Sequence, residues 1–249
     1  EVHAQNRLSI LAACEDPFNV ATFEYAGKVW PLVQTGQMWL EYEILRKPDV
    51  AGYFCLTTSY RQEPNPVPGR HDIIFPMFEF EFKGTMEDLI VLQKELLTHL
   101  GYGKYNYYVN DYKAIAEEFG TVELEHEHEE RLYKEKSPVS FITNFPEFTS
   151  PFWNMRRNPN DDTSKKVDVI LSGQETFGSA ERETDKTIMR ERFNTIMDGA
   201  YKAKLFELFG EERTMLELEE YLDLEFIPRV GQGIGLTRLI RSMEKENLL

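Results

Sequence analysis

The spacing of hydrophobic and polar residues along the chain predicts a mixture of strands and helices. Apolar runs of strand length, bounded by turn-forming residues, predict strands at Tyr53–Tyr60, Ile73–Phe82, Val139–Thr143, Val167–Leu171 and Phe226–Val230. Helical periodicity predicts helices at Met86–Leu100, Tyr112–Phe119, Asp185–Phe209 and Thr237–Lys245, and a weaker signal indicates a further helix at Met38–Arg46. The strands do not alternate regularly with single helices. We therefore expect an α+β fold with a mostly antiparallel sheet flanked by helices, in a single domain over residues 1–249.

The stretch from Cys55 to Lys83 predicts two strands around the Pro-rich loop Glu63–Gly69. Alternation along the second strand divides its side chains between two faces: Phe75, Met77, Glu79 and Glu81 on one, and Phe78, Phe80 and Phe82 on the other. We expect the all-Phe face to be core. Two carboxylates on the opposite face then indicate that something polar binds there, the alternative being a solvated face with surface ion pairs.

Basic side chains lie at the ends of this loop. Arg61, Arg70 and His71 are placed where they can hold a triphosphate over the carboxylate face. A second glycine-containing stretch, GQGIGLTRL from Gly231 to Leu239, predicts a Gly-rich turn that opens a helix with Arg238 in its first turn. The glycines would let a ligand approach the backbone and let Arg238 reach a phosphate, the alternative being a turn packed on the sheet.

A third stretch, VDVILSGQETFGSAERE from Val167 to Glu183, predicts a hairpin with Ser172 and Gly173 as its turn. In that register Ile170 faces Glu175, and Asp168 and Glu175 become diagonal neighbours on one face. Two carboxylates at this spacing suit Mg²⁺ bound between protein and phosphate. The alternative is a hairpin carrying two unrelated surface acids.

Composition narrows the choice of partners. Lys and Arg number 28 against 43 Asp and Glu, a formal charge of −15, so generic adhesion to nucleic acid or to an anionic membrane is disfavoured. No apolar stretch has the length of a membrane span, and only Cys14 and Cys55 are present, which fits a reducing cytosol. We read the acidic run Glu123–Glu130 as a solvated segment, because His126 and His128 would face apart on a helix.

Taken in order, these stretches resemble the catalytic domain of class II aminoacyl-tRNA synthetases, in the aspartate and asparagine branch. YRQE followed by GRHDIIFPMFEFE is similar to the second family motif, and GQGIGLTRL is similar to the third. DVILSGQETFGSAER resembles the segment that binds magnesium and the amino-acid side chain. TGQMWLE resembles the segment that reaches the amino acid through its Gln, and FPEFTSPFWNM resembles the strand and turn before the metal-binding acid. We expect the first family motif to lie upstream of Glu1 or in the first residues.

The resemblance implies roles for individual residues. It implies an ATP site made of Arg61, Glu63, Arg70, His71, Phe75, Gly233, Gly235 and Arg238, with Arg61 and Arg238 as the catalytic residues. It implies an amino-acid site made of Gln37, Glu79, Ser179 and Arg182, in which Glu79 takes the ammonium and Arg182 takes a carboxylate or amide oxygen. It implies Mg²⁺ held by Asp168 and Glu175.

Three functions are compatible with this pattern. The first is an ATP-dependent ligase that adenylates aspartate and passes it to ammonia or another small amine. It is suggested by the lack of the anticodon-binding barrel that true synthetases of this branch carry. In this respect the sequence resembles the archaeal asparagine synthetases. The second is an asparaginyl- or aspartyl-type synthetase acting on tRNA; Leu40, at a position where the aspartate enzymes carry Lys, favours asparagine. The third is a non-catalytic paralogue that binds nucleotide or amino acid. We narrowly favour aspartate, with tRNA the less expected acceptor, and expect a cytoplasmic homodimer.

Overall fold

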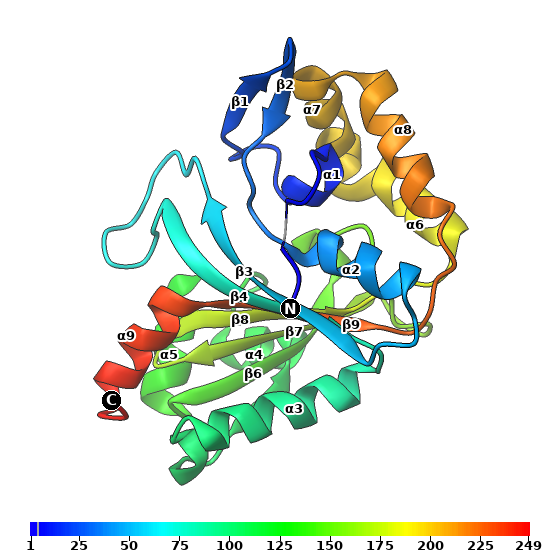
Figure 1. Ribbon diagram of the computed structural model, residues 1–249. Helices are drawn as coiled ribbons and strands as arrows, with labels where there is room; N and C mark the ends of the chain where they lie inside the picture. Colours follow the sequence, from blue (N-terminus) through cyan, green and yellow to red (C-terminus); the bar gives the residue numbers. More distant parts are fainter. Residues whose placement is uncertain (4) are drawn as a thin grey trace. The chain divides into compact units, whose positions relative to one another are not determined.

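A computed structural model describes residues 1–3 and 5–249 of the chain (Figure 1). These residues divide into two compact units, each assembled from separate stretches of sequence. Unit 1 comprises Glu1–Lys83, Phe152–Asn154 and Glu183–Pro228, and unit 2 comprises Gly84–Pro151, Met155–Arg182 and Arg229–Leu249. The assignment of residues 1–249 to a single domain stays a prediction.

Unit 1 contains more helix than strand and carries two β-hairpins. Its elements are α1 (Ile10–Ala13), β1 (Thr22–Tyr25), β2 (Lys28–Pro31), α2 (Gln37–Arg46), β3 (Gly52–Tyr60), β4 (Ile74–Phe82), α6 (Lys186–Thr195), the short 3-10 helix η3 (Ile196–Gly199), α7 (Ala200–Phe209) and α8 (Glu211–Leu222). β1 pairs with β2 and β3 pairs with β4, both antiparallel. The core gathers around the fully buried Trp153, whose ring meets Phe193 and Tyr221 edge-on.

The long helix predicted at Asp185–Phe209 is in fact two helices. α6 ends at Thr195 and α7 begins at Ala200. Between them Met197 and Asp198 both have φ of 54°, a left-handed conformation that no α-helix can contain. The prediction of a single helix was wrong because helical periodicity continues on both sides of this kink.

The two faces of the β3–β4 hairpin are covered in the opposite way to the one predicted. Glu79 and Glu81 are fully buried, whereas Phe54 and Leu56 are 39% and 63% exposed. The phenylalanines expected to form core are half-buried and stack mainly on one another, in the order Phe54, Phe78, Phe80, Phe82. The alternation along β4 correctly predicted which side chains share a face. The polarity of these side chains did not show which face is buried: α2 packs against both strands on the face with the carboxylates.

Unit 2 is built on a sheet. Its elements are α3 (Met86–His99), the 3-10 helix η1 (Tyr102–Lys104), β5 (Tyr108–Asp111), α4 (Tyr112–Phe119), α5 (His126–Glu135), β6 (Val139–Pro146), the 3-10 helix η2 (Glu147–Thr149), β7 (Thr163–Leu171), β8 (Gln174–Glu181), β9 (Val230–Gly235) and α9 (Leu236–Lys245). The strands run in the order β9-β8-β7-β6-β5, and only β5 and β6 are parallel. This mixed α+β architecture with a mostly antiparallel sheet confirms the predicted fold class.

The glycine-rich segment of unit 2 is a strand, which corrects two predictions. β9 covers Val230–Gly235, whereas we placed a strand at Phe226–Val230 and a turn at the glycines. Gly231, Gly233 and Gly235 are buried, and Gly233 pairs with Gly178 of β8. Glycine has low strand propensity, so the pattern favoured a turn, but here two glycines on neighbouring strands lie opposite each other.

The sheet of unit 2 presents one face to α3 and the other to α4 and α5. On the α3 side, Gln93 donates to Ser179 and to Gln232. On the other side Ile142 and Ile170 pack with Leu132 of α5 and Ile115 of α4. Asp168 pairs directly with Ile142, so it belongs to the face that α4 and α5 cover. Among the residues that the structure describes, no helix is long and apolar enough to cross a membrane.

Candidate functional site

Glu79 on β4 is a fully buried acid of unit 1. Its carboxylate accepts hydrogen bonds from Thr35 Oγ1 at 2.5 Å, from the Gly36 N–H at 2.7 Å and from the Thr57 hydroxyl. Burial raises the pKa of Glu79 above its ordinary value, while these three bonds act to lower it. A Cβ on Gly36 would lie 2.8 Å from Glu79 Oε2, so only glycine permits this approach. The site is therefore a rigidly held, nearly dry carboxylate.

Arg61 and Phe75 come together at the open end of the same hairpin. The Arg61 guanidinium carbon lies 5.9 Å from the centroid of the Phe75 ring. Arg61 Nη2 pairs with Glu15 Oε2 at 3.0 Å, and its Nε is buried without a hydrogen-bond partner among residues 1–3 and 5–249. A guanidinium with an unsatisfied donor beside an aromatic ring can bind an anion that carries a planar group.

The loop that joins β3 to β4 carries the remaining basic residues predicted for ATP. His71 Nδ1 accepts from the Val67 N–H at 3.2 Å, which leaves Nε2 to face other groups. The Arg70 N–H donates to the Val67 carbonyl, so the loop closes on itself. Glu63 is half-buried near the start of the loop. Gln37 is the first residue of α2, and its backbone N–H donates to Thr35 Oγ1.

The carboxylates of Asp168 and Glu175 converge in unit 2. The turn at Ser172 and Gly173 is confirmed, with Leu171 opposite Gln174 and Ile170 opposite Glu175. Gly178 lies opposite Asp168, and a Cβ built on Gly178 would be 3.3 Å from Glu175 Oε1 and 3.9 Å from Asp168 Oδ1. Both acids therefore face the small space above Gly178. The shared face agrees with the predicted register, but a bulge at Thr176 places Gly178 instead of Phe177 opposite Asp168.

Asp168 is a buried carboxylate whose two oxygens differ in their contacts. Its side chain is 7% exposed, Lys166 Nζ pairs with its Oδ2, and its Oδ1 is buried without a hydrogen-bond partner in the described chain. Burial raises the pKa of Asp168 to about 7; Lys166 opposes this shift and Glu175 adds to it. A free hard oxygen beside a second carboxylate fits Mg²⁺ shared with phosphate. Three or more His, Cys, Asp or Glu side chains do not cluster as a metal site within the described ranges.

Arg238 lies at the same end of β8. It is in the first turn of α9, as predicted, and its Nη1 donates to the Glu175 carbonyl at 2.8 Å. Gly235, the last residue of β9, is close enough that a Cβ there would lie 3.7 Å from Arg238 Cδ. The structure thus brings Asp168, Glu175 and Arg238 together.

Ser179 lies on the other face of β8 from this group, and its assignment to the amino-acid pocket stays a prediction. It pairs with Val167 and follows Gly178, so its side chain points to the α3 face, where its Oγ donates to the Val167 carbonyl at 2.5 Å. Arg182 is buried and has the same strand parity as Gly178. Glu181 points to the opposite face, as predicted, and accepts from Arg156, from Lys165 and from the Met86 N–H.

Comparison with protein families identifies this arrangement. The profile described as tRNA synthetases class II (D, K and N) matches residues 9–248. The chain belongs to this class II synthetase family. No curated protein matches the sequence.

Solved class II synthetases share the fold. Asparaginyl-tRNA synthetase from Pyrococcus horikoshii complexed with asparaginyl-adenylate is 21% identical, with a TM-score of 0.76 over 95% of this chain and 58% of that chain. Asparaginyl-tRNA synthetase from Entamoeba histolytica is 19% identical, with a TM-score of 0.73 over 92% and 56%. Aspartyl tRNA synthetase from Entamoeba histolytica is 20% identical, with a TM-score of 0.66 over 85% and 48%. The chain therefore spans about half the length of these proteins, and its resemblance to the aspartyl and asparaginyl branch is confirmed.

Sequence reasoning missed several residues of this candidate site. Thr35 and Thr57 hold Glu79, and Glu15 pairs with Arg61, yet each comes from a different segment and carries no motif of its own. Lys166 was detectable, because it lies two residues before Asp168 on the same strand face. Glu129 was read as part of a solvated acidic run, but that run enters α5 and Glu129 Oε2 accepts from the Glu175 N–H.

Proposed function

We propose that the chain is an ATP-dependent ligase that activates aspartate as an aminoacyl-adenylate and transfers it to ammonia or another small amine. The observation that carries this proposal is the buried Asp168 with a free Oδ1 beside Glu175, in a member of the class II synthetase family. An adenylate bound to the Pyrococcus horikoshii protein, which has the same fold, supports adenylation as the chemistry.

ATP is proposed to bind to the residues that the family resemblance implies. Arg61 binds the α-phosphate and stabilises the negative charge that builds there during attack, using the donor that lacks a protein partner. Phe75 stacks on adenine. The terminal phosphates bind to Arg70, His71 and Arg238, with Glu63 near the base and with Gly233 and Gly235 keeping β9 free of side chains. Mg²⁺ held by Asp168 and Glu175 would neutralise phosphate charge.

Aspartate is proposed to bind with its ammonium on Glu79 and its side-chain carboxylate on Arg182, and Gln37 contacts the substrate. Glu79 is suited to this role because its three donors orient the carboxylate and oppose the rise in its pKa that burial causes. A planar guanidinium pairs two N–H groups with a carboxylate, and the neighbouring Glu181 is turned away from Arg182. This arrangement favours aspartate over asparagine.

The reaction proceeds in two balanced steps. A carboxylate oxygen of aspartate attacks the α-phosphorus of ATP, the bond from that phosphorus to the bridging oxygen breaks, and pyrophosphate leaves. Ammonia then attacks the acyl carbon, AMP leaves with the former carboxylate oxygen, and the nitrogen loses a proton to water. The formal charge of −15 favours such a small acceptor over tRNA, which is the alternative.

Pyrophosphate exchange with each amino acid in turn, followed by product analysis with ammonia and with tRNA, tests this proposal. We expect exchange with aspartate and formation of the amide. Charging of tRNA would support the synthetase alternative, and nucleotide binding without exchange would support the non-catalytic alternative. Arg61→Ala is expected to reduce exchange about 10²-fold or more, because it removes one preorganised contact to the developing charge.

We also propose a homodimer formed through the exposed apolar face of the β3–β4 hairpin. This face includes Phe54, Leu56 and Ile74, which are 39%, 63% and 59% exposed. An apolar sheet face of this kind favours association over contact with water. Light scattering is expected to give the mass of a dimer for the wild type and of a monomer for Leu56→Glu.

A further inference from the structure

The backbone of Glu175 is held by side chains where the β-ladder stops. Pairing of β8 with β9 begins at Phe177 and Ile234, and the register with β7 shifts between Val169 and Ile170. The polar backbone groups of Glu175 therefore have no strand partner toward β9, and buried backbone groups need one. The Glu175 N–H donates to Glu129 Oε2 at 2.9 Å, and its carbonyl accepts from Arg238 Nη1 at 2.8 Å.

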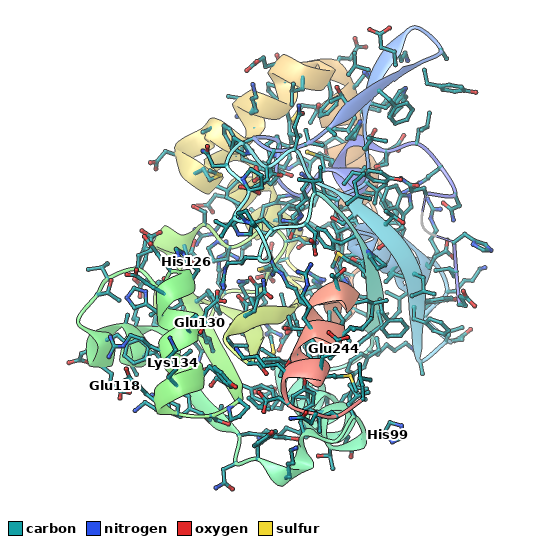
Figure 2. All side chains as sticks on the ribbon, turned by 90° about the vertical axis from the view of Figure 1, so that its left-hand side faces the viewer. His99, Glu118, His126, Glu130, Lys134 and Glu244 are labelled. Carbon is teal, nitrogen blue, oxygen red and sulfur yellow. The ribbon has the colours of Figure 1, made fainter. Side chains whose placement is uncertain are left out.

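Glu129 belongs to α5, which lies close to the β7–β8 hairpin at a second point. α5 also carries Glu130, whose Oε1 would lie 2.9 Å from a Cβ built on Gly173. Figure 2 shows His126, Glu130 and Lys134 following one another along this helix, with Glu244 on α9. α9 fixes the other side of the turn, because Lys245 Nζ donates to the Ser172 carbonyl at 2.9 Å and Ser172 Oγ donates to Glu246 Oε1 at 2.8 Å. The hairpin end is thus clamped between α5 and α9.

These contacts from α5 and α9 are important because Glu175 lies beside the β-bulge, where strand pairing is irregular. Regular pairing resumes only at Phe177, so the adjacent β9 strand does not fix the direction of the Glu175 Cα–Cβ bond. The contact from Glu129 supplies that restraint on the amide side. Glu129 is half-buried, and its negative charge contributes to the raised pKa of Asp168.

We propose that Glu129 is a positioning residue, whose carboxylate holds the Glu175 N–H so that the Asp168 and Glu175 carboxylates converge on one divalent cation. The inference rests on the proposed function, in which these two acids hold Mg²⁺ with ATP. Glu129 acts through Glu175 and is not itself a ligand. Loss of such an outer contact is expected to weaken metal binding about 10-fold or more.

Three substitutions separate the hydrogen bond from the charge. Glu129→Gln removes the charge but keeps a carbonyl oxygen that can accept from the Glu175 N–H. Glu129→Asp keeps the charge but shortens the side chain by one methylene, so the acceptor no longer reaches the amide. Glu129→Ala removes both. Glu127→Ala is the matched control, since Glu127 lies on the same helix with a side chain that is 69% exposed.

The readout is Mn²⁺ binding, measured by electron paramagnetic resonance on the full chain with a non-hydrolysable ATP analogue. We expect Glu129→Ala and Glu129→Asp to bind Mn²⁺ about 10-fold more weakly than wild type, and Glu129→Gln and Glu127→Ala to bind within about three-fold of it. Wild-type affinity in Glu129→Asp, or weak binding in Glu129→Gln alone, would overturn the positioning role. If Glu129→Ala does not fold, the Gln and Asp variants decide.

The proposed metal site has its own test in the same titration. Asp168→Asn is expected to abolish the tight Mn²⁺ signal. If it leaves that signal unchanged, the metal lies elsewhere and the proposed function fails. If Asp168→Asn abolishes the signal while all Glu129 variants retain it, only the positioning role fails.

Discussion

Two buried carboxylates, one in each unit, show how differently a protein can treat the same chemical group. Glu79 is fully buried and accepts from two hydroxyls and one backbone N–H. Asp168 is almost as deeply buried, but only its Oδ2 is paired and its Oδ1 meets no donor in residues 1–3 and 5–249. A saturated carboxylate is part of the fold and offers a fixed charge. A carboxylate with only one oxygen paired lowers the stability of the folded protein, and a bound cation can offset that loss.

The largest expected effect comes from Glu79→Gln. The substitution removes the charge proposed to hold the substrate ammonium, so amino-acid-dependent pyrophosphate exchange should fall about 10²- to 10³-fold. The NH₂ group of the substituted side chain also faces one of the former donors, which then has no acceptor. The free energy of unfolding should therefore fall by about 1 to 3 kcal/mol. Urea denaturation and exchange assays check both effects. Glu24→Gln, on the exposed strand β1, is the control, and an unchanged stability in Glu79→Gln would contradict the comparison.

Asp168→Asn is expected to separate activity from stability. Exchange should fall about 10²-fold because a proposed metal ligand is lost, but at neutral pH the protein should be as stable as wild type or more stable, because a costly buried charge has gone. Thermal melts without metal measure the second effect. Asp162→Asn, an exposed acid of unit 2, is the control. A strongly destabilised Asp168→Asn would mean that Asp168 is part of the fold, like Glu79.

The pKa of Asp168 gives a pH dependence with a definite sign. Burial raises this pKa from 3.8 to about 7, so the carboxyl binds its proton more tightly in the folded protein than in the unfolded one. Its contribution to stability is complete below about pH 4 and is lost as the pH rises to about 7. The advantage of Asp168→Asn over wild type should grow across this range to about 4 kcal/mol, measured by urea denaturation at each pH. A difference that does not vary with pH would refute it.

Thr57→Val tests the other carboxylate with a smaller change. It removes one of the three donors to Glu79 and conserves the volume of the side chain. Because that hydrogen bond lowers the pKa of Glu79, its loss should raise this pKa and move the acidic limb of the exchange profile to higher pH. We expect a three- to ten-fold loss of exchange at neutral pH. Thr58→Val, on the opposite face of β3, should leave the profile unchanged.

The sequence was sufficient for the parts of the site that depend on local register. The turn at Ser172 and Gly173 set the pairing of Ile170 with Glu175, and the pairing put Asp168 on the same face. Both turn residues have positive φ, which suits the hairpin geometry that this dipeptide favours. A two-residue turn leaves little freedom, so counting along the chain was enough.

What the sequence could not provide depends on contacts between distant segments. Burial of the β4 acids depends on α2, and the donors of Glu79 come from positions up to 44 residues away. The face of Ser179 depends on the bulge at Thr176, which shifts the register by one residue and has no signature in the sequence. The glycines of β9 were predicted to form a turn and not a strand. Close packing between strands and a flexible turn both favour glycine, so the residue type alone does not separate them.

The interleaving of the two units has a consequence for how the chain is made. Unit 1 lacks its last three helices until Pro228 has been synthesised, and unit 2 lacks β9 and α9 until the ribosome has passed Leu249. Unit 1 can therefore finish folding only after most of unit 2 has been synthesised, and both units depend on contacts between segments far apart in sequence, which form slowly. During translation the chain therefore passes through a period in which both units have incomplete cores, and apolar surface that is later buried is exposed.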